Sequence, residues 1–142
     1  MMDIKKNILD RPRRLRKNRN LREMVRENHL HLDEFIYPMF VTNGNKIKNE
    51  IPSMPGVYQW SMDMIGSEID TIMNMGISKI LLFGVSEKKD EQGSETWLDD
   101  GIIQKTVRRL KQEFPELYII SDVCFCGYTD HGHCGVLQNG DL

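Results

Sequence analysis

The sequence predicts an α/β fold in which parallel strands alternate with helices. Three mostly apolar segments, 35–41, 79–85 and 117–123, have the length and composition of strands. Two amphipathic segments, 61–75 and 100–114, separate them and repeat their apolar residues at helical spacing. This order implies a parallel sheet with right-handed crossovers, so the loops that follow the strands are expected to gather at one face.

A short helix is predicted over residues 20–28, ahead of the first strand. Its apolar residues Leu21, Met24 and Val25 recur at helical spacing. We expect them to form a packing face rather than a binding surface.

The first strand is expected to pair irregularly, because Pro38 has no N–H to donate to a ladder. Segment 42–60 is rich in Asn, Gly, Pro and Lys, with turns marked by Pro52 and Pro55, and it predicts a loop. The second strand, 79–85, is an apolar run after Lys79, as is typical of strands buried on both faces.

The two predicted helices have recognisable ends. Ser61 is expected to cap the helix 61–75, and Gly76 to end it. The helix 100–114 stops before Pro115. The inner stripe of the first helix is Ile65, Ile69 and Ile72. The inner stripe of the second is Ile103, Val107, Leu110 and Phe114.

The predicted elements are those of the N-terminal part of a TIM-type (β/α)8 barrel. A complete barrel needs about 250 residues, whereas the sequence has 142. No helix is predicted after the third strand, so we expect a barrel that is truncated there. We expect residues 1–33 to form a basic arm with a short helix, and residues 34–142 to form the barrel part.

The composition is that of a soluble globular protein, with 28% charged residues and a net charge of −2. No apolar run is long enough to cross a membrane, and the N-terminus lacks the apolar core of a signal peptide. Nine Lys or Arg residues and one acid lie between Lys5 and Arg22. These cations could contact phosphates, but no aromatic residues or base-reading module accompany them. We therefore expect no nucleic-acid partner and favour an arm that docks on another subunit.

The three cysteines lie within eleven residues, directly after the third strand. They are Cys124, Cys126 and Cys134. Zinc prefers thiolate ligands, and three of them leave one tetrahedral position open. In an extended chain, Asp122 would share a face with the first two cysteines. Turns at Gly127 and Gly132 would then bring back the third, which predicts a metal site at a strand's C-terminal end.

Other interpretations of the cysteines remain open. They could be buried apolar residues, or form a disulfide with one thiol left over, although Cys-x-Cys closes a tight loop and nothing suggests secretion. They could also build a purely structural zinc site with His131 or His133 as the fourth ligand. Free thiols at a metal site imply a reducing compartment, so we expect a cytoplasmic protein.

Residues 122–135, with their three cysteines and the pair His131 and His133, resemble the metal signature of the delta-aminolevulinic acid dehydratase family, also called porphobilinogen synthase. The resemblance covers nearly the whole chain. The other segments that follow the family's order and spacing are 11–16, 35–41, 51–57 and 80–85.

The resemblance implies a TIM-type barrel enzyme, a lyase that condenses two molecules of 5-aminolevulinate into porphobilinogen in tetrapyrrole and heme biosynthesis. It implies that Cys124, Cys126 and Cys134 bind catalytic zinc, whereas some members carry carboxylate-type ligands and depend on magnesium. Asp122 matches an active-site aspartate, for which a merely hydrogen-bonded carboxylate is the alternative. His133 matches a histidine that lies behind the metal ligands.

The resemblance also implies a large homo-oligomer, commonly an octamer, in which the arm embraces a neighbouring subunit, and magnesium as a further metal of the complete enzyme. The family binds its substrates through two lysines that form Schiff bases, and no lysine here lies in the matching context. We therefore expect the chain alone to be inactive, and loosely folded or prone to aggregation. The alternative function is a non-catalytic zinc-binding or subunit-assembly protein.

Overall fold

The computed structural model describes residues 13–135 and 137 of the chain. The chain divides into two compact units, Met1–His31 and Leu32–Leu142, which are described one at a time. The first twelve residues of the predicted arm, including Arg11, lie outside the described residues. Among the described helices, none has both the length and the apolar character needed to cross a bilayer.

The first unit contains the 3-10 helix η1 (Arg14–Arg16) and the α-helix α2 (Arg19–Met24). Asn18 caps α2, because its side chain accepts a hydrogen bond of 2.9 Å from the backbone nitrogen of Leu21. The helix is therefore fixed at its start by a polar side chain and has no buried residue.

The predicted length of this helix is wrong, and its apolar residues are not buried within the chain. The helix ends at Met24 instead of residue 28. Met24 is 80% exposed and Val25 is 43% exposed. Leu21 is half-buried. A helix of six residues is too short to be stable without packing.

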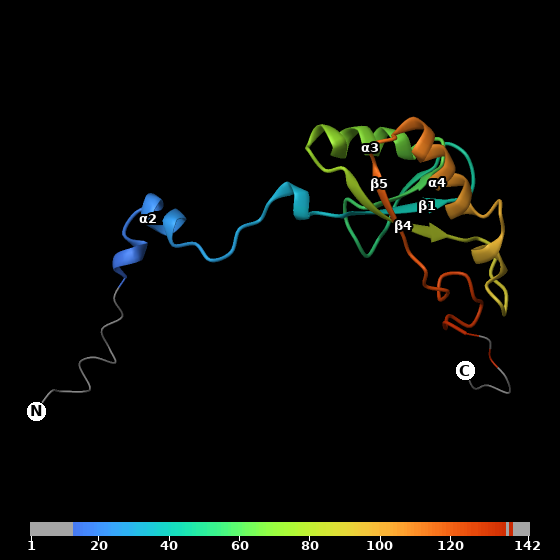
Figure 1. The fold of residues 1–142 in the computed structure, drawn as a ribbon. Coiled ribbons are helices and arrows are strands. Elements are labelled where there is room, and N and C mark those ends of the chain that lie inside the picture. Colours follow the sequence, from blue (N-terminus) through green and yellow to red (C-terminus); the bar gives the residue numbers. More distant parts are fainter. Residues whose placement is uncertain (1–12, 136, 138–142) are drawn as a thin grey trace, which may run out of the picture. The chain divides into compact units, whose positions relative to one another are not determined.

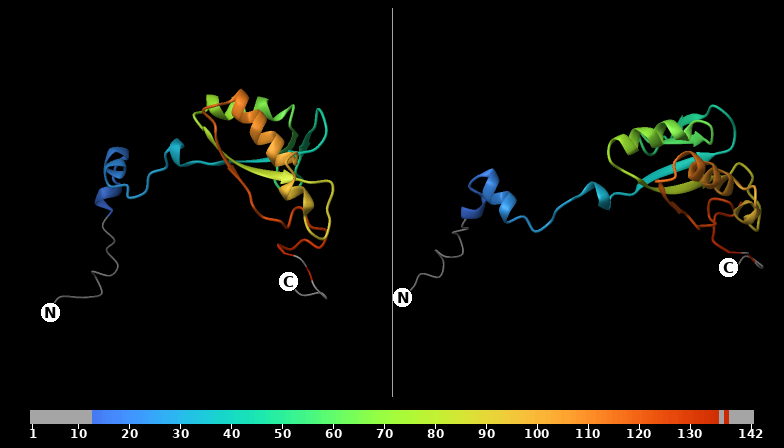
Figure 2. Two further views of the ribbon diagram at one scale, coloured as in Figure 1. Left: turned by 45° about the vertical axis from the view of Figure 1, so that its right-hand side comes forward. Right: turned by 45° about the horizontal axis from the view of Figure 1, so that its top comes forward.

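The second unit is built on one five-stranded sheet, preceded by the 3-10 helix η2 (Leu32–Glu34). Its strands are β1 (Tyr37–Thr42), β2 (Lys48–Glu50), β3 (Tyr58–Ser61), β4 (Lys79–Val85) and β5 (Tyr118–Ser121). Their order is β2-β3-β1-β4-β5 (Figure 1, Figure 2). The three strands predicted from the sequence pair in parallel in that order, which confirms the α/β fold.

The predicted loop 42–60 is wrong, because it contains the two short strands β2 and β3. They pair antiparallel with each other, from Lys48 opposite Trp60 to Glu50 opposite Tyr58. β3 also pairs in parallel with β1, so the sheet is mixed. Lys48 lies over the rings of both aromatic residues, 4.5 Å and 4.6 Å from their centroids, which ties the hairpin together.

The irregular pairing expected at Pro38 is also absent. β1 and β4 pair residue by residue from Tyr37 with Ile80 to Thr42 with Val85. β3 pairs with β1 only from Phe40 onward. Pro38 therefore lies where β1 has a single strand partner, and its missing N–H leaves the ladder intact.

Two helices follow β3 and β4: α3 (Ile65–Asn74) and α4 (Ile102–Glu113). Ser61 does not cap α3 as predicted. It is the last residue of β3, where its hydroxyl accepts a hydrogen bond of 2.8 Å from the nitrogen of Ile47. Gly76 follows α3 as predicted, with a φ of +91° that favours glycine.

The inner faces of the helices are predicted correctly for α3 and only partly for α4. In α3, the buried residues are Ile65, Ile69 and Ile72. In α4, the fully buried residues are Ile102, Thr106 and Leu110. The predicted Ile103, Val107 and Phe114 are half-buried against the same core. Compared with the predicted stripe, the buried stripe of α4 is therefore shifted by about one residue, and it includes Thr106.

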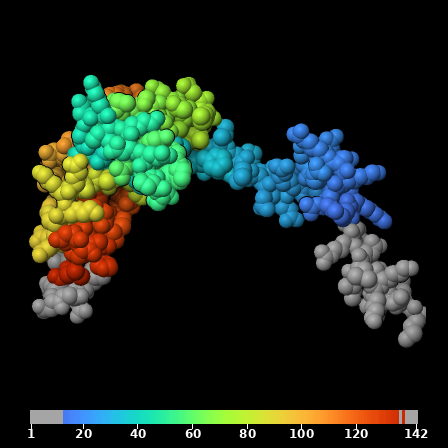
Figure 3. Space-filling model, turned by 180° about the vertical axis from the view of Figure 1, so that it is seen from behind, coloured from blue at the N-terminus to red at the C-terminus, as the bar shows by residue number. Residues whose placement is uncertain are grey.

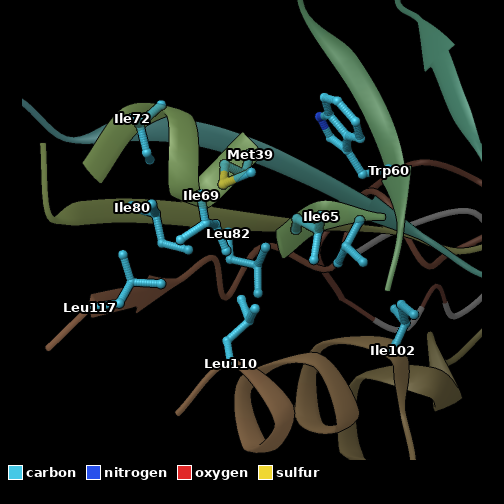
Figure 4. Packing of buried hydrophobic residues seen from close by; sticks show 11 residues of the cluster. Met39, Trp60, Ile65, Ile69, Ile72, Ile80, Leu82, Ile102, Leu110 and Leu117 are labelled. Carbon is cyan, nitrogen blue, oxygen red and sulfur yellow. The ribbon is translucent and has the colours of Figure 1, made fainter. Parts of the chain in front are cut away.

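Both helices cover one face of the sheet. Met39 of β1 lies in register with Leu82 of β4, so both side chains point to the same side. There they join the isoleucines of α3 and Leu110 of α4 in one core cluster (Figure 4). The opposite face is only half-buried, and on it Phe40 and Phe83 stack with ring centroids 5.0 Å apart. β4 is therefore fully buried on one face, not on two.

The third predicted strand is shorter and more exposed than its apolar sequence indicates. β5 ends at Ser121, and Tyr118 is 64% exposed. Val123, which was predicted to lie in this strand, is 85% exposed. Among the described strands, β5 pairs with β4 alone, so its outer side has no strand partner.

Thr106 offers a test of the core packing. Its hydroxyl is buried and has no hydrogen-bond partner. Replacing Thr106→Val keeps the shape and removes this desolvated group. We expect the free energy of unfolding to rise by about 1 kcal/mol in urea denaturation.

The matched control is Thr71→Val on the exposed side of α3, where the hydroxyl donates to the carbonyl of Ser67 at 2.9 Å. We expect this control to change the unfolding free energy by less than about 0.5 kcal/mol. A loss of stability in Thr106→Val would show that the hydroxyl has a partner after all.

Candidate metal centre

The three cysteines lie together in the loop that follows β5. The Sγ atom of Cys134 is 3.4 Å from that of Cys124 and 3.2 Å from that of Cys126. All three sulfurs lie within 4.8 Å of one another, and none is in a disulfide. Cys124 and Cys134 are exposed, which excludes the interpretation of buried apolar residues.

The cysteines converge by a different route from the one predicted. The strand ends at Ser121, so Asp122 and the first two cysteines lie beyond the sheet and not along a strand. Instead, the backbone nitrogens of Tyr128 and Thr129 both donate to the carbonyl of Phe125, at 2.8 Å and 3.1 Å. This turn reverses the chain. Of the two predicted turning glycines, only Gly132 has a left-handed φ, of +76°.

Polar contacts within the loop fix two of the cysteines. The carboxylate of Asp122 accepts a hydrogen bond of 3.3 Å from the nitrogen of Cys124. The sulfur of Cys134 accepts one of 3.3 Å from the nitrogen of Phe125. Hydrogen bonds from Cys126, Cys124 and backbone nitrogens lower the pKa of Cys134 to about 7. Hydrogen bonds to Cys134 and Cys124 raise the pKa of Cys126 to about 11. The cluster therefore ionises first at Cys134.

The donor set suits a soft, tetrahedral metal ion. Zn–S bonds of about 2.3 Å in a tetrahedron separate the sulfurs by about 3.8 Å, which is slightly more than the 3.2 Å and 3.4 Å from Cys134 to its two neighbours. Among the described residues, the group of ligand atoms contains only the three thiols. The structure does not bring His131 or His133 into this group, so among the described residues the three thiols are the side chains that could hold an ion together here.

The two histidines contact other parts of the loop. The nitrogen of His133 donates to Nδ1 of His131 at 3.3 Å, and the two rings stack with centroids 6.0 Å apart. Nε2 of His131 lies 3.2 Å from the carbonyl oxygen of Glu91. His133 directly precedes Cys134 in the chain. Its backbone nitrogen is held by the ring of His131.

A pocket of about 170 Å³ lies beside the cysteines. Asp122, Cys124 and Phe125 line one side of it, and Glu95 and Tyr128 line another. The half-buried Glu95 lies in the short 3-10 helix η3 (Ser94–Trp97) that follows β4. A helix of four residues gives no periodic signal in the sequence, so sequence reasoning missed it.

Tyr128 forms part of the pocket wall and is buried. Burial raises the pKa of Tyr128 to about 12, and the carboxylates of Glu95 and Asp122 add to the shift. A Cβ at Gly84 of β4 would overlap the Tyr128 hydroxyl, so this glycine makes room for the ring. Tyr128 therefore remains a neutral hydrogen-bond donor at neutral pH.

The loops after the parallel strands meet at the sheet edge, as predicted from the β-α-β-α-β order. On the surface, the segment after β4 lies against the segment after β5 (Figure 3). The carboxylate of Glu95 accepts a hydrogen bond from the buried hydroxyl of Ser86 and one of 3.3 Å from the amide of Asn43. These contacts join the loop after β4 to the end of β1.

A mostly parallel sheet, with a cysteine cluster and a pocket at the carboxyl ends of its strands, matches the arrangement of barrel proteins, and its site could hold a metal ion. A family model described as Delta-aminolevulinic acid dehydratase matches residues 9–142. The chain belongs to the delta-aminolevulinic acid dehydratase family, and its strands and helices form part of a TIM-type barrel.

Relatives of that name support this assignment. The proteins from Halalkalibacterium halodurans and Synechocystis sp. are 48% and 50% identical over 132 residues, which is 93% of this chain. The chain spans only 40% of the length of each. The relative from Ruminiclostridium josui is 45% identical over 131 residues, and 64% of its length is covered.

A solved structure shows the same arrangement of elements. It is the porphobilinogen synthase of Toxoplasma gondii in complex with the reaction product porphobilinogen. The TM-score is 0.85 at 35% sequence identity, and the match covers 92% of this chain and 37% of the other.

The different pKa values of Cys134 and Cys126 predict which of the two thiols reacts first in the metal-free protein. Because the pKa of Cys134 is lowered to about 7, its reactive thiolate accumulates as the pH rises through 7. Cys126, with a pKa of about 11, remains a thiol there. We expect iodoacetamide at pH 7 to label Cys134 before Cys126, as measured by peptide mass spectrometry in the presence of a chelator.

The control is the same chain in concentrated urea, where the cluster is dispersed and the three cysteines should react at similar rates. Equal labelling rates at pH 7 in the folded protein would contradict the hydrogen-bonded arrangement of the thiols.

Proposed function

We propose that this chain supplies the metal-binding part of a porphobilinogen synthase, a lyase that condenses two molecules of 5-aminolevulinate into porphobilinogen. The observation that carries the proposal is the three-thiol cluster beside a pocket lined by Asp122. The reaction is inferred from the family to which the chain belongs. The cysteine cluster is the site at which a bound metal would promote it.

The metal we propose is zinc, held by Cys124, Cys126 and Cys134. Thiolates favour zinc over magnesium, which prefers oxygen ligands. When bound, zinc would act as a Lewis acid that polarises and positions a substrate oxygen or nitrogen at the open side of the cluster. A role of magnesium in the complete enzyme is part of the same proposal.

Asp122 is the proposed catalytic carboxylate. It lines the pocket next to Cys124 and its Oδ1 atom is engaged by the nitrogen of that residue. A carboxylate held in this way can orient a substrate amine or accept a proton from it. Tyr128, on another wall of the pocket, remains protonated and can donate a hydrogen bond to a substrate oxygen.

His133 is proposed to orient the metal ligands rather than to bind the metal. Its backbone precedes Cys134 and is held on both sides, by His131 and by Thr129. Groups that hold a ligand in this way affect metal affinity strongly, even though they do not touch the ion.

The covalent part of the reaction is proposed to lie in the remainder of the relatives' length. Schiff-base formation requires a lysine amine close to the substrate carbonyl, and no lysine is among the described residues that line the pocket. We therefore propose that the 142-residue chain alone forms no porphobilinogen.

The cellular setting is also a proposal. Free, exposed thiols favour a reducing compartment such as the cytoplasm. The exposed apolar residues of the first unit, among them Leu15 and Met24, favour contact with another subunit in a homo-oligomer.

A chimaera tests the proposed function. The chain replaces the matching 40% of the Synechocystis relative, and the rest of that protein is retained. We expect the chimaera with zinc to form porphobilinogen from 5-aminolevulinate, whereas the chain alone does not. Replacing Cys124→Ala and Cys126→Ala should abolish activity, because one thiolate cannot hold the ion.

The control is Ser67→Ala, which removes one exposed hydrogen bond in α3 and should leave turnover unchanged. Turnover that persists in the double cysteine variant would contradict the role of the cluster. Turnover by the chain alone would show that one of its own lysines serves as the covalent group.

A further inference from the structure

The loop after β4 has a fixed shape of its own at Asp90–Ser94. Oδ1 of Asp90 accepts hydrogen bonds from the nitrogens of Gln92, at 2.9 Å, and of Ser94, at 3.0 Å. Gly93 lies between them with a left-handed φ of +64°. These bonds fix the shape of the loop from within. The loop that follows β5, residues 122–134, is called the metal loop below.

Backbone hydrogen bonds join the Asp90–Ser94 loop to the metal loop. The nitrogen of Asp90 donates to the carbonyl of Tyr128 at 3.3 Å, and the nitrogen of Asp130 donates to the carbonyl of Asp90 at 3.2 Å. Together they form an isolated parallel bridge between Asp90 and Thr129. A Cβ at Gly93 would lie 3.4 Å from Cγ2 of Thr129, so the two loops are in direct packing contact.

Thr129 links the contact between the two loops to the segment that carries Cys134. It is only 1% exposed, although it lies in a loop. Its nitrogen donates to the carbonyl of Phe125, between the first two cysteines, and its hydroxyl donates to the carbonyl of His133 at 3.0 Å. His133 directly precedes Cys134. One buried residue therefore ties together the two ends of the metal loop.

We propose that Thr129, held by the Asp90–Ser94 loop, is a positioning residue that aims the Cys134 thiolate at the point shared by Cys124 and Cys126. The inference rests on the proposed metal site. Without the hydroxyl, the carbonyl of His133 has no described side-chain donor and the segment 132–134 is free to shift. Binding a metal must then include the cost of ordering that segment.

The test compares Thr129→Val, which removes the hydroxyl and keeps the shape, with Thr129→Ser, which keeps the hydroxyl. Thr106→Val is the matched control, since it removes another buried hydroxyl, in α4, that has no hydrogen-bond partner. Each full chain is titrated with cobalt(II), and both the dissociation constant and the thiolate-to-cobalt charge-transfer absorbance are measured.

We expect Thr129→Val to bind cobalt about tenfold more weakly, since one hydrogen bond and some loop order are lost. Its absorbance per bound cobalt should fall by about a third, because one thiolate of three is displaced. Thr129→Ser and Thr106→Val should match the wild-type chain. A purely structural effect would alter the thermal midpoint but not the absorbance per bound ion.

A second variant covers the case in which Thr129→Val does not fold. Asp90→Ala opens the exposed loop without touching a buried residue, and we expect weaker cobalt binding from it as well. Wild-type affinity and absorbance in Thr129→Val, or in Asp90→Ala where the first does not fold, would overturn the inference. Absence of a thiolate band in the wild-type chain would instead overturn the proposed metal site.

Discussion

The parallel pairing of β5 with β4 determines where every candidate functional group lies. The register runs from Lys79 with Tyr118 to Leu82 with Ser121, so β5 ends beside the middle of β4. The nitrogen of Asp122 then donates to the carbonyl of Leu82 at 3.1 Å, and the chain leaves the sheet at that point. A shift of one residue would turn Asp122 to the other face of the sheet and separate it from the pocket.

Most of the barrel elements follow from apolar periodicity in the sequence. β4 and α3 are found because their apolar residues repeat over seven or more positions. The β2–β3 hairpin is missed because strands of three and four residues show no periodic signal. What stabilises that hairpin is Lys48 across two aromatic rings, a contact that sequence reasoning does not reveal. Ser61 illustrates a further limit, since the hydroxyl that was expected to cap a helix bonds within the sheet instead.

The cysteine cluster is predictable from residue types, but the way in which it forms is not. Three thiols within eleven residues predict a shared metal site, which requires the chain to turn back between them, and the observed turn is at Phe125. Glu95 and Asp90 are not predictable as site residues, because they lie more than 25 positions before the cysteines. Their role follows from tertiary contacts between two loops that the sheet brings to the same edge.

The central claim is that the three thiols hold one zinc ion. Their sulfur atoms lie within 4.8 Å of one another, so one ion could contact all three. X-ray absorption at the zinc edge of the loaded chain tests this most directly. The account predicts three sulfur neighbours at about 2.3 Å and one lighter neighbour. A shell of oxygen and nitrogen alone would contradict it.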